Sequence, residues 1–261
     1  MSPDIPLPGP ADRSVDYGLR PNPPYASEPS SDSFTPKEST MRRYRFETLF
    51  ALVLLVLYAA FFLWQTPGLI RGKLTAEEID GYLKVCEASP SLPEPDRSQI
   101  VHDLREWALK DDGQPVYMLN LLRNYPELRP YPGAPDMHGM TPDQANAYYE
   151  ANVTKLALKD GDFPIFMGPA QGNNVVGREA DADNWSRVIV MRYPARRNVL
   201  ALFCSPEYLP FAPYKLASLK INLVPTSAEL VLADLRVLLG AVLLILFFAV
   251  SWLRAVRRPA A

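Results

Sequence analysis

Two long apolar runs lie near the two ends of this 261-residue chain. The first is LFALVLLVLYAAFFLW at 49–64, the second is VLLGAVLLILFFAVSWL at 237–253, and neither contains a charged residue. At about 1.5 Å per residue, each run covers roughly 25 Å as a helix, so a few flanking residues complete a span of about 30 Å of hydrocarbon. A buried core helix would keep a polar stripe, and a signal peptide would not follow about forty other residues. We therefore predict transmembrane helices at 46–70 and 232–254.

The basic residues beside these runs predict the orientation of the chain. Arginines 42, 43 and 45 precede the first run and arginines 254, 257 and 258 follow the second, whereas the inner flanks carry only Arg71, Lys73 and Arg236. Because basic residues stay on the cytoplasmic side during insertion, six cations against three place both termini in the cytoplasm. Our interpretation is a bacterial inner-membrane protein with two spans and a periplasmic central domain.

The first 41 residues have the composition of a disordered tail. Nine of the first forty residues are proline, mixed with serine and acidic residues. Such a segment cannot bury enough apolar surface to offset its conformational entropy. Residues 1–41 are therefore predicted to be a disordered, proline-rich tether.

The charge and the cysteines exclude some classes of function. A formal net charge of −2 leaves no basic surface for nucleic acid. The only cysteines, Cys86 and Cys204, lack the spacing of a zinc site, and no metal or cofactor is expected. The two could form one disulfide in an oxidising compartment, but we favour two small buried thiols.

A helical pair is predicted at 72–113, between the first span and the central domain. Thr75 and Glu78 match a capping box, and Ile79, Leu83 and Cys86 follow it at helical spacing. Three prolines between residues 88 and 96 separate this helix from a second one that begins near Ser98.

At Gln114 the helical spacing gives way to short β-forming segments. The expected order is a strand at 115–124, a helix at 142–160, strands at 163–168 and 187–193, a broken helix at 195–219 and a strand at 220–226. This order predicts an α+β fold, namely a ferredoxin-like βαββαβ domain at 114–228. It has one antiparallel sheet with both helices on one face, is preceded by the helical pair and is flanked by two transmembrane helices.

Three stretches of this domain resemble the domain-of-unknown-function family 1330, which belongs to the dimeric α/β-barrel superfamily. They begin at PVYMLNLLRN, DGDFPIFMGPA and NWSRVIVMRYPARR, and the most specific part joins Arg192-Tyr193-Pro194 to the Ser205–Tyr208 motif SPEY. The resemblance covers about residues 114–228 and implies the fold and a homodimer. It implies little about activity, because a shared fold does not determine chemistry.

The first strand also favours a dimer. Met118 and its alternate neighbours point one way, Tyr117 and Leu119 point the other, and neither set is polar enough to face water. Two sheets packed face to face would cover the second face and leave a cavity between them. We expect Met118 on the face that the partner covers, so that Met118→Asp would break the dimer.

A small-molecule ligand in that cavity would meet the few polar residues of the strands and of the long 125–140 loop. These candidate ligand-binding residues are Asn120, Arg123, His138, Tyr148 and Arg192. The best candidate is Arg192, which could instead pair with a protein carboxylate such as Glu179 or Asp181.

Two classes of function remain open on the sequence. The favoured one is a membrane-anchored module whose barrel binds a small apolar ligand or a protein partner. The alternative is a cofactor-independent enzyme, an oxygenase or isomerase, for which His138 is the weak catalytic candidate.

Overall fold

The structure, a computed structural model, describes residues 38–131, 133–176, 184–231 and 234–257. The chain divides into two units, Met1–Tyr44 and Arg45–Ala261, and the fold below is that of the second unit. The predicted tail lies outside the described residues as far as residue 37, and residues 38–41 belong to the first helix.

Two helices are long and apolar enough to cross a membrane. They are α1 (Glu38–Trp64), with its apolar part at Tyr44–Trp64, and α8 (Leu235–Val256), and their mean hydropathies are 2.3 and 2.4. Side chains of the two helices contact each other, because the rings of Phe50 and Phe247 lie 6.2 Å apart and Arg254 lies over the ring of Phe46. The two apolar helices predicted from the sequence are therefore present.

The helical pair is α3 (Ala76–Glu87) and α4 (Asp96–Ala108), preceded by the short helix α2 (Gly68–Arg71). Thr75 and Glu78 form the predicted capping box, and Ile79 and Leu83 are buried as their spacing indicated. Arg196 ties the pair to the rest of the domain, because it donates to the carbonyl of Trp107 at 2.5 Å.

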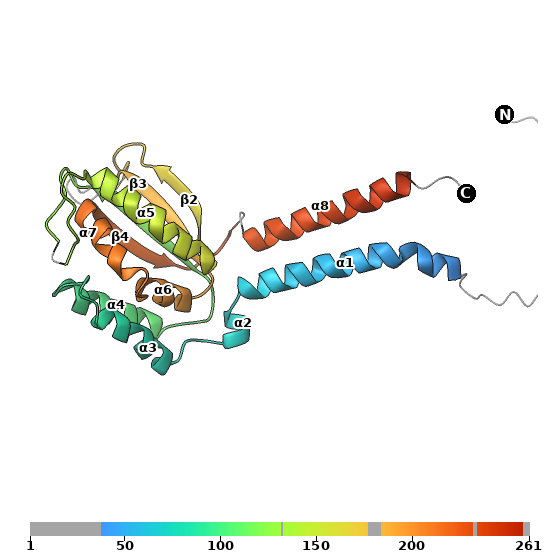
Figure 1. Cartoon of the computed structure of the whole chain (residues 1–261), viewed down its shortest axis with the longest axis horizontal. Coiled ribbons are helices and arrows are strands. Elements are labelled where there is room, and N and C mark those ends of the chain that lie inside the picture. The colour runs from blue at the N-terminus through green and yellow to red at the C-terminus, as the bar shows by residue number, and fades with distance from the viewer. Residues whose placement is uncertain (1–37, 132, 177–183, 232–233, 258–261) are drawn as a thin grey trace, which may run out of the picture. The chain divides into compact units, whose positions relative to one another are not determined.

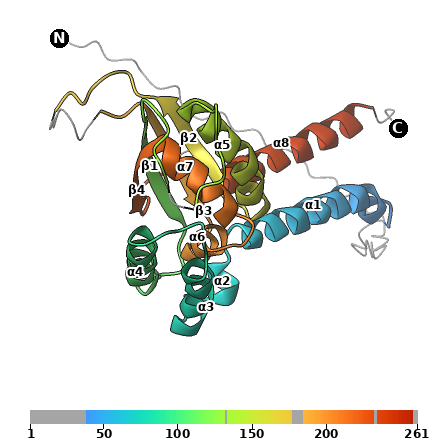
Figure 2. The same cartoon turned by 60° about the vertical axis from the view of Figure 1, so that its left-hand side comes forward.

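A four-stranded antiparallel sheet forms the centre of the domain (Figure 1). Its strands are β1 (Val116–Asn124), β2 (Phe163–Pro169), β3 (Arg187–Tyr193) and β4 (Leu219–Thr226), in the spatial order β2-β3-β1-β4. The connections contain α5 (Pro142–Lys159), α6 (Arg196–Phe203), the 3₁₀ helix η1 (Leu209–Phe211) and α7 (Ala212–Ser218). Helices α5 and α7 lie over the same face of the sheet in both views (Figures 1 and 2). The predicted α+β class with one antiparallel sheet is confirmed.

The two faces of the sheet differ in how they are covered. Met118 is 4% exposed and belongs to the core beneath the helices, so its predicted place on the other face is wrong. Strand alternation in β1 instead directs Leu119 and Leu121 to the face away from the helices. We call this surface the open face; its apolar members are Leu119, Leu121, Val188, Val190 and Val224.

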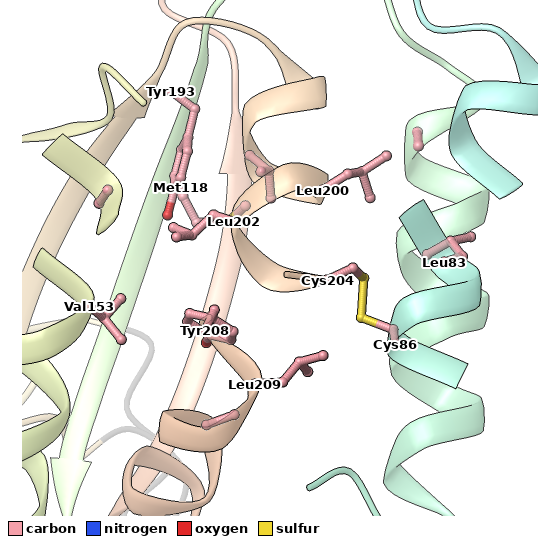
Figure 3. Close-up of a cluster of buried hydrophobic side chains, with 14 of the residues drawn as sticks. Leu83, Cys86, Met118, Val153, Tyr193, Leu200, Leu202, Cys204, Tyr208 and Leu209 are labelled. Atoms are coloured by element: carbon pink, nitrogen blue, oxygen red, sulfur yellow. A yellow bond between two sulfur atoms is a disulfide. The ribbon is translucent and has the colours of Figure 1, made fainter. Parts of the chain in front are cut away.

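The sulfurs of Cys86 and Cys204 form a disulfide, and this corrects the interpretation of two free thiols. The bond joins α3 to the end of α6, with Cα atoms 4.9 Å apart, and it lies beside Leu200 and Leu209 in the core (Figure 3). The sequence could not show this, because both cysteines also fit the apolar faces of their own helices. The packing of α3 against α6 brings them together.

Candidate functional site

An apolar pocket of about 450 Å³ lies between helix α4, helix α7 and the edge strand β4. We call it the α4–β4 pocket. Its volume is within the roughly 300–1,000 Å³ typical of small-molecule sites. The apolar side chains that line it include Leu92, Ile100, Leu104, Trp107, Met118, Leu216, Ile221 and Leu223.

The local sequence patterns explain which side chains each element presents to the pocket. Ile100, Leu104 and Trp107 recur at helical spacing and therefore share one face of α4. Ile221 and Leu223 alternate along β4 and face the helices. The disulfide partner Cys86 also lines the pocket, so the bond holds the helical pair against this site.

Two charged residues, Lys215 and Asp103, belong to the pocket wall. Lys215 of α7 is half-buried, and its Nζ lies 5.1 Å from the centroid of the Tyr149 ring. Burial lowers the pKa of Lys215 to about 8, a shift that the nearby carboxylate of Glu150 opposes. Asp103 of α4 is exposed and accepts a hydrogen bond from Gln99 at 2.8 Å.

Tyr208 adds a buried hydroxyl to the wall. Its oxygen lies 3.3 Å from that of Tyr149, and burial raises the pKa of both phenols. Both hydroxyls are therefore protonated at neutral pH. Tyr208 therefore offers the pocket a neutral hydroxyl and no strong base.

Arg192 is fully buried, away from this pocket. Its guanidinium donates to Gln65 at the end of α1, with Nη1 2.5 Å from the side-chain oxygen and Nη2 3.2 Å from the backbone oxygen. Glu179 and Asp181, the carboxylates suggested as its partners, lie outside the described residues. Arg192 therefore fastens the end of the first apolar helix to the sheet.

Asp162 lies in the same buried region and is 0% exposed. Neither carboxylate oxygen has a hydrogen-bond partner among the described residues. Burial, helped by the negative charge of Asp160, raises the pKa of Asp162 to about 8, although Arg192 lowers it in part. Gly161 allows this close packing, because its φ is +84° and a Cβ there would lie 2.7 Å from the Gln65 amide nitrogen.

The structure does not bring the five predicted ligand-binding residues together in this pocket. Asn120 is buried and donates to the carbonyl of Met118 at 2.8 Å, while strand alternation directs Arg123 to the open face. The His138 side chain is 97% exposed and lies 3.6 Å from Asp136, which gives it no protected cavity for acid–base chemistry. Tyr148 packs on Tyr214, with the two ring centroids 4.7 Å apart.

Sequence reasoning missed the residues that do line the pocket. The available signal was Lys215, a lysine inside the apolar helical segment PYKLASL. Its significance depends on α4, from about one hundred residues earlier in the chain, lining the same pocket as α7 and β4. That arrangement is not readable from local spacing.

Comparisons with known proteins leave the family unassigned. No family model and no curated protein matches this chain. A crystal structure of the methylated RPA0582 protein is 19% identical, with a TM-score of 0.42, and the match covers 52% of this chain and 93% of that one. A second structure, of the RPA0582 protein of unknown function from Rhodopseudomonas palustris, is 18% identical with the same TM-score. That match covers 51% of this chain and 94% of the other. SnoaB, a cofactor-independent oxygenase from Streptomyces nogalater, is 14% identical with a TM-score of 0.28. That match covers 46% of this chain and 99% of SnoaB. The resemblance to family 1330 stays a prediction.

Proposed function

We propose that this chain is a membrane-anchored binding protein whose extracytoplasmic domain, a ferredoxin-like dimeric α/β barrel, holds a small apolar ligand. The α4–β4 pocket supports this proposal most directly, because apolar side chains from several helices and strands line it and few polar groups interrupt them. The two apolar helices would anchor the domain at both of its ends.

The disulfide supports the extracytoplasmic position. Disulfides persist in oxidising compartments such as the periplasm and are rare in the cytosol. The bond between Cys86 and Cys204 agrees with the arginine distribution, which predicts cytoplasmic termini.

Thiol labelling of intact cells tests the topology, because the chain contains no cysteine outside the disulfide. Lys110→Cys, at an exposed position just after α4, should react with a membrane-impermeant maleimide in intact cells. Arg257→Cys, just after α8, should react only after the membrane is permeabilised, and the wild-type protein should not react at all. Labelling of Arg257→Cys but not of Lys110→Cys in intact cells would contradict the proposed orientation.

The apolar surface of the open face supports the proposed dimer. Leu119, Leu121, Val188 and Val190 are only half-buried in a single chain, and Val224 is 37% exposed. A second copy of the sheet would remove this apolar surface from water. Such burial stabilises a dimer by roughly 25 cal/mol per Å² of apolar surface. We infer that the dimer forms through this face.

Native mass spectrometry can test the dimer and the ligand together, on the full chain after its release from detergent. The wild-type protein should appear as a dimer with one small molecule per chain. Leu119→Arg would bury an unpaired charge between the sheets and should give monomers that still carry the small molecule. Leu158→Arg, at an exposed position of α5, is the matched control and should remain dimeric. A monomeric wild-type protein, or a dimeric Leu119→Arg variant, would rule out this interface.

A further inference from the structure

Lys215, in the wall of the α4–β4 pocket, lies near one carboxylate, Glu150, which already has partners of its own. The carboxylate oxygen Oε1 of Glu150 accepts hydrogen bonds from Arg187 at 2.6 Å and from Asn146 at 3.0 Å. Arg187 therefore already neutralises Glu150. Lys215 adds a second positive charge near Glu150. Among the described residues, no carboxylate lies within ion-pair distance of its Nζ.

The half-buried ammonium of Lys215 contacts the face of the Tyr149 ring, and the described residues offer its Nζ no hydrogen bond. In this partly desolvated wall, an anion beside the ammonium would form an ion pair that water screens only in part. Burial already disfavours the charged form, as the lowered pKa of Lys215 indicates. A ligand that supplies a hydrogen-bond acceptor would favour the charged form of Lys215 and raise its pKa.

The opposite wall of the pocket would repel such an anion. Asp103 of α4 is acidic, and its carboxylate is solvent-exposed and held by Gln99. An acidic group in the pocket is therefore favoured at Lys215 and disfavoured along α4. The remaining wall, formed by residues such as Leu104 and Leu223, suits an alkyl chain.

We propose that the α4–β4 pocket binds a single-chain amphiphile with a carboxylic acid head, with the carboxylate at Lys215 and the alkyl chain between α4 and β4. This inference rests on the proposed binding of an apolar ligand and adds the chemistry of its head group. Lys215 is the residue that distinguishes an acid from a neutral molecule of the same length.

A pair of photoactivatable probes tests this inference on the full chain in discs of neutral phosphatidylcholine. One probe is a diazirine-bearing dodecanoic acid and the other is its methyl ester, and mass spectrometry of the peptides locates the labels. Both probes should also label α1 and α8 from the lipid, which gives an internal reference for each sample. In the wild-type protein the acid should label the pocket peptides more strongly than the ester.

Two variants at one position give the decisive comparison. Lys215→Met should lower the ratio of acid to ester labelling about tenfold or more, since a hydrogen bond to a charged group is lost, and Lys215→Arg should keep it. Continued ester labelling of Lys215→Met shows that its pocket is folded. An unchanged acid preference in Lys215→Met, or equal labelling by both probes in the wild-type protein, would overturn the assignment of the acid head.

The remaining outcomes separate this inference from the function on which it rests. Labelling by neither probe would refute the apolar-ligand function itself. Adding phosphatidylglycerol to the discs should leave acid labelling unchanged if the occupant is a free acid. Loss of acid labelling in the discs with phosphatidylglycerol would overturn the assignment of a free acid and indicate an anionic phospholipid as the occupant.

Discussion

Asp162→Asn is expected to stabilise the protein strongly at alkaline pH. The wild-type carboxyl group is fully buried without a hydrogen-bond partner among the described residues, and its pKa is raised from 3.8 to about 8. The native state therefore holds a proton between about pH 4 and pH 8 that the unfolded chain releases, so stability falls as the pH rises through this window. A shift of this size corresponds to an upper limit on the order of 5 kcal/mol.

Thermal unfolding followed by tryptophan fluorescence at several pH values measures this effect. At about pH 9, asparagine avoids the buried charge, and Tm should rise on the order of 10 °C over the wild-type protein. At about pH 4 the two proteins should unfold at similar temperatures, because the wild-type carboxyl is then neutral in the native state. Asp160→Asn is the matched control, since Asp160 is only a secondary cause of the shift, and most of the pH dependence should remain. Equal pH dependence in the wild-type protein and Asp162→Asn would show that Asp162 is not a buried, neutral acid.

Removing the disulfide is expected to cause the largest loss of stability. Cys86 and Cys204 are separated by 118 positions, so the bond closes a long loop in the unfolded chain. The chain-entropy model gives a loss on the order of 5 kcal/mol for a loop of this length, and removal of native disulfides typically costs about 2–5 kcal/mol. The double variant Cys86→Ser, Cys204→Ser should therefore show a clearly lower Tm.

Adding a reductant provides the control for this variant. The wild-type Tm should fall toward that of the double variant, whereas the double variant should not respond. The helical pair should also become more accessible to protease, because the bond holds α3 against α6. A double variant with the wild-type Tm, or a wild-type protein insensitive to the reductant, would contradict a stabilising role of the bond.

Local signals in the sequence predicted most of the secondary structure. The capping box predicted at Thr75 marks the start of α3. The helix predicted at 142–160 is α5, and a second capping box, at Thr141, begins it. The strongly β-forming run at 187–193 became β3, with the same bounds as predicted. Caps and short apolar runs act within a few residues, so the sequence shows them directly.

The pocket and the places of the candidate residues depend on contacts between distant residues, and they could not be predicted in the same way. Arg192 was expected to need an acceptor, but its partner Gln65 lies 127 positions earlier in the chain. Met118 was placed on the wrong face, because both faces of β1 are apolar and alternation alone does not show which one the helices cover. The pocket requires α4 and β4 to line the same space, and no local pattern indicates that arrangement.

The central claim is that the α4–β4 pocket binds a small apolar molecule, and photolabelling by the neutral methyl ester in lipid discs tests it most directly. In the wild-type protein, labels should appear on pocket peptides of α4, α7 and β4 as well as on α1 and α8. Leu104→Trp fills the pocket from α4, whereas His102→Trp places the same side chain at an exposed position of that helix. Pocket labelling, normalised to α1 and α8, should fall several-fold in Leu104→Trp and stay unchanged in His102→Trp. Labels confined to α1 and α8 in the wild-type protein, or undiminished pocket labelling in Leu104→Trp, would contradict the claim.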